Sequence, residues 1–245
     1  MESKILYDIH THTTYSHGKG SIADNAAAAA ACGLKLLGIA DHGPGHISYG
    51  MDINKLPQMR KDIEDAKALY PGLDIQLGVE ANIVNFSGKI DVSREDAELF
   101  DYIIAGYHYA YFGEKPAHGL AVCVSGWLSD HGLPTSAGRR AQNTELIISA
   151  LWENNIKVLT HPGDKMPVNI EAIARTCEER GTILEINDHH THLTTEEIKA
   201  VQKFNVEFIL SSDAHVPANV GRVEGALARA EEAGLDLSRI VNLRR

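Results

Sequence analysis

Histidine and carboxylate pairs occur in this sequence at spacings that suit metal binding. The segment DIHTHTTYSH places His10 and His12 two residues apart, and SSDAH places Asp213 and His215 at the same spacing. On an extended strand, side chains at positions i and i+2 point to the same face, so each pair can reach one ion. Neutral imidazole is the commonest protein ligand of metals, and the chain has 13 histidines. Metal chemistry is therefore the first hypothesis.

Further candidate ligands stand where short apolar segments end. GIADHG contains Asp41 and His42, GVEAN contains Glu80, AGYH ends in His108 and LTHPG contains His161. His17 follows the first pair on a loop. The candidate metal ligands are thus His10, His12, His17, His42, Glu80, His108, His161, Asp213 and His215. This set exceeds the four ligands of a tetrahedral site, so it suits two or three ions with a carboxylate as bridge.

The apolar segments that precede these residues are expected to be strands. They cover residues 4–9, 34–40, 73–79, 102–106, 156–160, 182–186 and 206–211, and helices fit residues 21–32, 54–69, 143–154, 168–180, 195–204 and 220–233. Strands too apolar to alternate, each followed by a helix, are typical of a parallel sheet covered by helices. In an α/β barrel the C-terminal ends of such strands meet at one site. We expect one barrel domain over residues 1–245, with a long loop or excursion at 109–140.

Composition narrows the classes of protein. The formal net charge of -10 argues against a broad nucleic-acid-binding surface, and a small anionic substrate remains compatible because bound cations would make one region locally positive. Cys32, Cys123 and Cys177 are scattered and lack CxxC spacing, which argues against a disulfide framework and a thiolate zinc site. We find neither a secretory signal nor a membrane-spanning apolar run, and expect a cytoplasmic protein with no membrane partner. A homo-oligomer remains open.

A series of motifs resembles one known family. In chain order these are DIHTHTTYSHG, IADHGPG, GVEANI followed by GKID, IIAGYH, THPG, LEIN and SSDAH. They are similar to the motifs of the PHP (polymerase and histidinol phosphatase) family of metal-dependent phosphoesterases, in particular its small bacterial stand-alone phosphatases. The resemblance covers nearly the whole chain. It implies a distorted seven-stranded (β/α) barrel with a trinuclear metal centre at the C-terminal ends of the strands.

The resemblance also implies how the ligands divide among the ions. One ion would take His10, His12, Glu80 and Asp213; a second would take His17, His42 and His215; the third would take His108 and His161 with Glu80 as bridge. Zinc is the expected metal by the same resemblance, with manganese and iron as alternatives. The expected reaction is in-line hydrolysis of a small phosphate ester by a hydroxide that bridges two ions.

Several residues near the predicted strand ends have weaker assignments. Asp41 is expected to accept a hydrogen bond from a ligand imidazole. Phosphate contact is open to Lys19, Arg139, Arg140, Lys165 and Arg222, although each is more commonly a solvated surface charge. The string NDHHTHL, with His189, His190 and His192, favours an exposed loop at least as much as a substrate contact, and we predict no fourth metal from it. The acid that protonates the leaving group is not identified.

Two other classes of protein compete with this hypothesis. An amidohydrolase-type barrel also begins with HxH and hydrolyses amides or esters, but its bridging carboxylated lysine is absent here. A non-catalytic metal-binding or regulatory protein would be indicated by an incomplete ligand set, whereas this set is complete. A nuclease is disfavoured because no basic tract accompanies the motifs.

Overall fold

The computed structural model describes residues 3–108 and 135–244. Seven parallel strands lie in one sheet in sequence order: β1 (Tyr7–Asp8), β2 (Leu36–Ile39), β3 (Asp74–Asn82), β4 (Tyr102–Gly106), β5 (Val158–Leu159), β6 (Ile183–Asn187) and β7 (Phe208–Ser211). A parallel bridge between Thr11 and Ala214 joins the chain beyond β1 to the chain beyond β7. The sheet therefore curls into a nearly closed barrel, which confirms the predicted seven-stranded α/β barrel.

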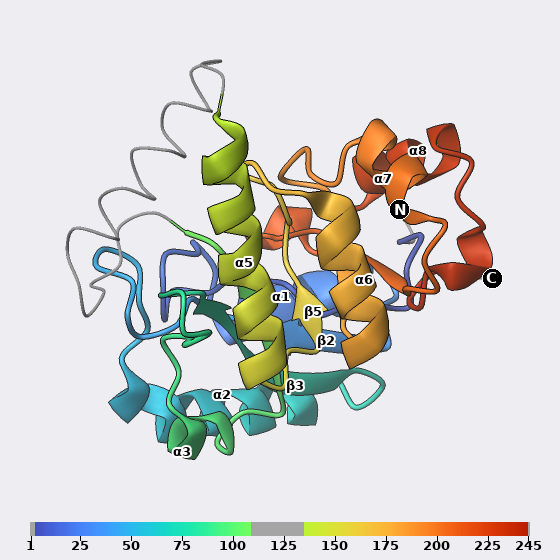
Figure 1. The fold of residues 1–245 in the computed structure, drawn as a ribbon. Coiled ribbons are helices and arrows are strands. Elements are labelled where there is room, and N and C mark those ends of the chain that lie inside the picture. Colours follow the sequence, from blue (N-terminus) through green and yellow to red (C-terminus); the bar gives the residue numbers. More distant parts are fainter. Residues whose placement is uncertain (1–2, 109–134, 245) are drawn as a thin grey trace.

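Helices connect the strands and surround the sheet (Figure 1). They are α1 (Ile22–Ala31), α2 (Leu56–Leu69), α3 (Arg94–Ala97), α5 (Ala137–Glu153), α6 (Ile170–Arg180), α7 (Thr195–Val201) and α8 (Glu224–Glu232), with short 3-10 turns at η1 (Ile53–Lys55), η2 (Pro217–Asn219) and η3 (Leu237–Arg239). None of the helices in this described part is long and apolar enough to cross a membrane.

Local sequence signals set the helix ends. The Ser21 hydroxyl accepts a hydrogen bond from the backbone N–H of Asp24, and the Asp24 carboxylate accepts one from the backbone N–H of Ser21. This pair is the capping box that begins α1. Gly181 ends α6 with φ of 68°, a conformation that glycine adopts without steric cost.

The helix α5 begins earlier than predicted. Ser136 caps it by accepting from the backbone N–H of Arg139, so the helix starts at Ala137 instead of residue 143. The end of the predicted excursion is thus helical, and its residues 109–134 lie outside the described part of the chain.

The ring of Tyr102 lies in the barrel interior, in a small core with Ile9, Ile104 and Ile209. The Tyr102 hydroxyl donates to the carbonyl of Ile9 at 2.8 Å. A Cβ at Gly78 would lie 2.2 Å from the Tyr102 ring, and one at Gly38 would lie 2.0 Å from its hydroxyl. Only glycine at these two strand positions leaves room for the ring. Glu80 follows Gly78 by two residues on the same face of β3, so its carboxylate lies beyond this ring, toward the C-terminal ends of the strands.

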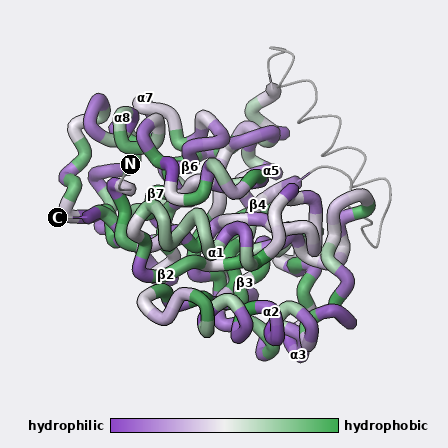
Figure 2. Tube along the Cα trace, turned by 180° about the vertical axis from the view of Figure 1, so that it is seen from behind, coloured by the Kyte–Doolittle hydropathy of each residue, from purple (hydrophilic) through white to green (hydrophobic). Residues whose placement is uncertain are grey.

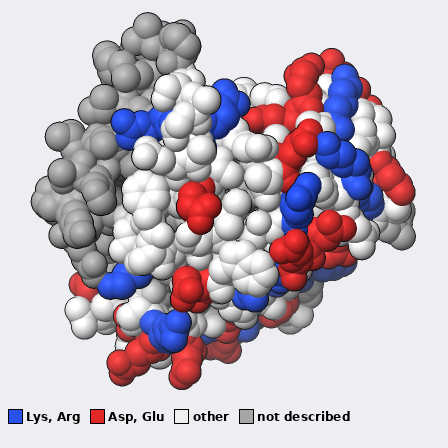
Figure 3. All heavy atoms as spheres, in the orientation of Figure 1, with Lys and Arg blue, Asp and Glu red and all other residues white. Residues whose placement is uncertain are grey.

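Apolar side chains also fill the layer between sheet and helices. Ile39, Leu77, Ala105, Leu184 and Leu210 are among the fully buried residues of this larger core. Hydrophobic residues are concentrated along the strands and hydrophilic ones on outer turns (Figure 2). On the face shown in Figure 3, acidic and basic side chains lie interspersed.

Candidate metal centre

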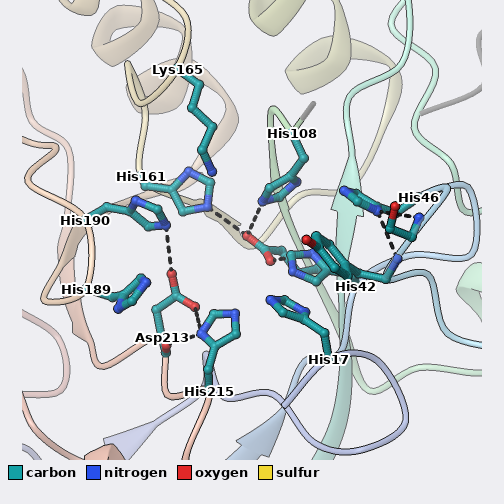
Figure 4. Close-up of a pocket in the computed structure, with 13 residues that line it drawn as sticks. His17, His42, His46, His108, His161, Lys165, His189, His190, Asp213 and His215 are labelled. Carbon is teal, nitrogen blue, oxygen red and sulfur yellow. Dashed lines mark hydrogen bonds and ion pairs between the residues drawn. The ribbon is translucent and has the colours of Figure 1, made fainter. Parts of the chain in front are cut away.

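A cavity of about 330 Å³ lies where the predicted ligands meet. Its walls combine side chains that follow six different strands, and Figure 4 shows them pointing toward one another. The lining residues are His17, His42, His46, Ser48, Tyr49, Glu80, His108, His161, Lys165, His189, His190, Asp213 and His215. His10 and His12 are each 1% exposed and contact the same carboxylates. The structure therefore brings all nine predicted ligand residues together.

The carboxylate of Glu80 is central to the cluster. Five imidazole nitrogens lie between 3.0 and 3.5 Å from its oxygens: His42 Nδ1 and His161 Nε2 at 3.0 Å, His10 Nε2 and His108 Nε2 at 3.3 Å, and His12 Nε2 at 3.5 Å. The residue is fully buried. A carboxylate with nitrogen donors on both oxygens is placed as a bridging ligand requires.

Asp213 forms the second carboxylate of the cluster. Its Oδ1 lies 3.2 Å from His12 Nε2 and 3.6 Å from His10 Nε2. Its backbone carbonyl accepts from Nδ1 of His215 at 2.8 Å. Asp213 and His161 have φ of 49° and 28°, in the left-handed region that non-glycine residues seldom adopt. The chain thus turns sharply after β5 and β7, at the residues whose side chains enter the cluster.

Oxygen acceptors outside the cluster orient two of the histidines. Nδ1 of His10 lies 2.6 Å from Oε1 of Glu185, and Nδ1 of His108 lies 2.6 Å from Oδ1 of Asn82. Asn82 in turn donates its side-chain N–H to Asp91 at 2.5 Å. A metal-binding histidine usually donates its second ring N–H to such an acceptor, which leaves the other nitrogen free for the metal.

The sequence analysis did not identify Glu185 and Asn82 as acceptors, although their spacing in two motifs indicates that they face the site. Asn82 follows Glu80 by two residues in GVEAN, and Asn187 follows Glu185 by two residues in LEIN. The same alternation that paired His10 with His12 places each pair on one face of its strand.

Asp41 has a different role from the one predicted. Its carboxylate accepts from the backbone N–H of Thr13 at 2.7 Å, from the Thr13 hydroxyl at 2.5 Å and from the Ser16 hydroxyl at 2.5 Å. The hydrogen bonds of Asp41 within the described residues run to this loop and not to an imidazole. The loop lies between His12 and His17, so Asp41 fixes the segment that carries two predicted ligands. The prediction of an imidazole partner was wrong because the side chain turns toward the loop after β1.

The five predicted phosphate-contact residues lie in different places relative to the cavity. Lys165 lines the cavity, where its Nζ lies 3.3 Å from Oδ2 of Asp164. Arg222 lines a neighbouring hollow with Asp188 and His189. The remaining three, Lys19, Arg139 and Arg140, do not line the cavity within the described residues.

Aromatic residues of the 46–49 loop form another wall of the cavity. Tyr49 stacks on His17 with ring centroids 4.3 Å apart and on His46 at 4.7 Å. Tyr49 remains 45% exposed, so one part of its ring is available to a bound molecule.

Burial and charge set the protonation of the cluster. Burial lowers the pKa of His17 to about 4 and that of His108 to about 3, and it lowers the pKa of His12 well below its usual range. Although burial opposes it, the surrounding imidazoles hold the pKa of Glu80 and that of Asp213 well below their ordinary values. At neutral pH His12, His17 and His108 are neutral and both carboxylates are ionised, which are the forms that bind metal. His10 differs, because, although burial opposes them, Asp213, Glu185 and Glu80 raise its pKa well above the ordinary value, so His10 would release a proton when an ion binds.

The donor atoms of the cluster fit divalent cations. Within the described residues, seven buried atoms of the set make no hydrogen bond: His10 Nε2, both ring nitrogens of His12, His17 Nδ1, His42 Nδ1, Glu80 Oε2 and Asp213 Oδ1. Buried polar atoms without partners cost free energy and are rare in folded proteins. Cations among these lone pairs would satisfy them.

The donor atoms fall into four overlapping groups in which all atoms lie within 4.8 Å of one another. The groups are His10–His12–Asp213, His12–His42–His215, His42–Glu80–His108 and His161–His190–Asp213. The first three correspond to the three predicted ions, with His12 replacing His17 in the second and His42 replacing His161 in the third. His17 still lies beside the second group, with its ring centroid 4.8 Å from that of His42 and 4.3 Å from that of His215. The fourth group contains His190, which was not predicted as a ligand.

Known proteins resemble this chain over most of its length. The family model described as the PHP domain matches residues 8–189. A probable phosphatase of Shewanella sediminis is 28% identical over 98% of this chain and 90% of its own length. A probable phosphatase of Shewanella sp. strain W3-18-1 is 30% identical over 96% of this chain and 86% of its own.

Two solved structures share the fold. One belongs to the crystal structures of YwqE from Bacillus subtilis and CpsB from Streptococcus pneumoniae, which are metal-dependent tyrosine phosphatases. The match covers 98% of this chain and 97% of that chain, with 17% identity and a TM-score of 0.52. The other is histidinol phosphate phosphatase of Lactococcus lactis complexed with zinc, L-histidinol and phosphate. This match covers 95% of this chain and 94% of that chain, with 15% identity and a TM-score of 0.50. At these identities the likeness concerns the fold alone.

Proposed function

Because the chain belongs to the PHP domain family, we propose that it is a phosphoesterase that hydrolyses the phosphate ester of a small molecule at a centre of three divalent cations. Its phosphatase relatives make it a hydrolase of phosphoric ester bonds. The observation that carries the proposal is the Glu80 carboxylate with five imidazole nitrogens within 3.5 Å. The match to the PHP domain model also argues against the alternative of an amidohydrolase-type barrel.

The nine predicted residues would hold the ions in three sets. These are His10, His12, Glu80 and Asp213; His17, His42 and His215; and Glu80, His108 and His161. Zinc is the first candidate because the donors are nitrogen and oxygen atoms and the Lactococcus neighbour contains zinc; manganese and iron bind similar donors.

Divalent cations in such a centre lower the pKa of bound water and withdraw negative charge from phosphate oxygens. The residues of the chain supply the geometry. Glu185 and Asn82 hold the rings of His10 and His108 from behind, so that each Nε2 faces Glu80. Rigid placement of this kind contributes to catalysis because the groups need no reorganisation during the reaction.

The cavity walls would select the substrate. Lys165 supplies an ammonium group at the edge of the cluster, where it can contact a phosphate oxygen. Tyr49 and Ser48 lie on another side and would contact the leaving group. A cavity of about 330 Å³ suits a small molecule, since ligand pockets of this kind measure roughly 300–1,000 Å³.

The test is a hydrolysis assay on metal-reconstituted protein. The panel contains sugar phosphates, nucleotides, histidinol phosphate, a phosphotyrosine peptide and phosphodiesters, with chelator-treated protein as the control. We expect hydrolysis of at least one small phosphate ester, lost on chelation and restored by zinc or manganese, with about three ions per chain by elemental analysis. Fully loaded protein that hydrolyses none of the panel would contradict the proposed activity, and a consistent content of one ion or none would contradict the trinuclear centre.

A further inference from the structure

His190 is oriented as a metal ligand although it belongs to none of the nine predicted positions. Its Nε2 lies 3.4 Å from Oδ2 of Asp213, and its Nδ1 lies 3.3 Å from Oδ2 of Asp164. Its ring centroid is 4.8 Å from that of His161, and Figure 4 shows both rings on the same wall of the cavity. The side chain is only 21% exposed. His190 is therefore turned inward, although its neighbours His189 and Thr191 are exposed as the histidine string suggested.

The same arrangement occurs at two of the predicted ligands. His10 lies between Glu185 at its Nδ1 and Glu80 at its Nε2, and His108 lies between Asn82 and Glu80 in the same way. At His190 the outer carboxylate is Asp164, at a longer distance of 3.3 Å, and the inner one is Asp213. An oxygen behind Nδ1 fixes the tautomer and directs the Nε2 lone pair into the centre.

The backbone around His190 is held in place by two side chains. Oδ1 of Asn187 accepts from the backbone N–H of His190 at 2.8 Å. The guanidinium group of Arg229, on α8, donates to the carbonyls of His190 at 3.2 Å and Leu193 at 3.1 Å. The loop therefore presents the imidazole in a position that is set before any ligand binds.

The inner carboxylate has an oxygen available on each side. Asp213 is 2% exposed, its Oδ1 is one of the buried atoms without a hydrogen bond, and that oxygen faces His10 and His12. Its Oδ2 faces His190 and accepts one hydrogen bond from the side chain of Asn187 at 3.2 Å, which leaves this oxygen a second lone pair for an ion. Asp213 can therefore bridge two positions, as Glu80 does.

We propose that His161, His190 and Asp213 form a fourth divalent cation position in this centre. Their donor atoms all lie within 4.8 Å of one another. This position would take His161 from the third ligand set named above, where His42 would replace it, because His42, Glu80 and His108 also form one donor group. His17 and His215, whose ring centroids are 4.3 Å apart, would remain at the second ion. Two imidazoles and one carboxylate leave coordination positions open for water or a phosphate oxygen, as catalytic zinc sites do. The inference rests on the proposed metal centre and adds one ion to it.

The test compares zinc binding by the wild-type protein with that of His190→Ala and Asp164→Asn. Zinc content is measured by elemental analysis, and affinity is measured by titration against a chromophoric chelator. We expect about four zinc equivalents per chain in the wild-type protein at saturating zinc, one more than the three of the proposed centre, and one fewer in His190→Ala. Asp164→Asn should keep that equivalent but bind it roughly 10–100-fold more weakly, because the loss of an outer acceptor typically has this effect.

His189→Ala is the matched control. His189 is adjacent in sequence and lines the same cavity, but its ring lies beside His215, at 5.3 Å between centroids, and it belongs to none of the four donor groups within the described residues. This variant should retain every zinc equivalent. Circular dichroism and thermal unfolding check that all three variants are folded. In crystals of the zinc-loaded wild type, anomalous diffraction at the zinc edge should place an ion about 2.1 Å from a ring nitrogen of His190.

Equal zinc content and affinity in His190→Ala and the wild type would overturn the proposal. A raised KM for a phosphate ester with unchanged zinc binding would also overturn it, because His190 would then contact substrate alone. The zinc comparison needs no turnover, so wild-type protein that binds zinc as expected but hydrolyses no ester would refute the phosphoesterase proposal and leave this one standing.

Discussion

Nδ1 of His10 lies 2.6 Å from Oε1 of Glu185, although 175 residues separate the two in the sequence. The other oxygen of Glu185 accepts from the backbone N–H of His161 at 2.7 Å and from the side chain of Asn187 at 2.9 Å. One fully buried carboxylate therefore positions two predicted ligands on neighbouring parts of the barrel.

Glu185→Gln should weaken metal binding without unfolding the protein. The amide keeps the shape and can still accept from His161, but it removes the charge behind His10. We expect the affinity for one ion to fall roughly 10–100-fold, as for other outer acceptors of metal-binding histidines. Chelator competition measures the affinity and circular dichroism checks the fold. Unchanged zinc affinity would mean that Glu185 serves the backbone of His161 alone.

The strands and the nine clustered residues could be predicted because each signal is local. Short apolar segments predict buried parallel strands, and a histidine or carboxylate at the end of each segment predicts a shared site. Glu185 and Asn82 were missed because the histidine that each one contacts lies on another part of the barrel, and the curvature of the barrel decides which ring faces them. Spacing along one strand does not predict which ring on another strand will face them.

His190 and Asp41 show a second limit of sequence reasoning. Arg229 holds the backbone of His190 from a helix 39 residues further along the chain. Asp41 turns toward Thr13, 28 residues earlier. In both cases a distant hydrogen bond sets which way the side chain points, and neighbouring residues in the sequence carry no sign of it.

Glu80→Gln should be the most damaging change to a single predicted ligand. The variant keeps the shape of the side chain but removes the negative charge among five imidazoles, so neighbouring cations repel one another more strongly. We expect the loss of at least one ion and a fall in hydrolysis of several orders of magnitude in a folded barrel. Arg139→Ala, on the first turn of α5, is the control and should change substrate preference at most. Metal content, circular dichroism and turnover are compared. Full metal content with near-normal turnover in Glu80→Gln would show that Glu80 is not a bridge.

Asp41→Asn should destabilise the loop that precedes His17. The carboxylate accepts three hydrogen bonds from Thr13 and Ser16, and an amide must turn its N–H₂ group toward one of these donors. We expect the free energy of unfolding to fall by about 1–3 kcal/mol, the usual cost of leaving a buried polar group unsatisfied. Urea unfolding of chelator-treated protein measures this loss separately from metal binding. A variant as stable as the wild type would argue that the loop is held by other contacts.

Lys165→Ala should raise KM for phosphate esters and leave the metal content unchanged. The ammonium group lines the cavity but is not among the metal-binding donors. Lys19→Ala is the control, because Lys19 is exposed and does not line the cavity. Steady-state kinetics at saturating zinc would separate the two variants. Equal KM values would exclude Lys165 as a phosphate contact.

The metal-free protein should lose stability as the pH falls below about 6.5, the ordinary pKa of histidine. Burial is the largest of the effects that lower the pKa of His108 to about 3; the imidazoles of His42 and His161 act in the same direction, and Glu80 opposes them. Between these two pH values the unfolded chain binds a proton at His108 that the folded protein does not. The free energy of unfolding therefore decreases as the pH falls, by about 1.4 kcal/mol per pH unit for this one group. His17, with a pKa lowered to about 4, acts in the same direction.

The contribution of His108 can be isolated with His108→Gln, which retains a polar partner for Asn82 but does not titrate. Urea unfolding of wild type and variant, both in chelator, is measured from about pH 7.5 down to about pH 5.5, around the ordinary histidine pKa. We expect the wild type to lose more stability than the variant over this interval, because only the wild type carries the buried neutral imidazole at this position. Chelator in every sample keeps metal release from contributing to the difference. Parallel pH profiles for the two proteins would show that His108 becomes protonated in the folded state near its ordinary pKa, and that its burial does not hold it neutral.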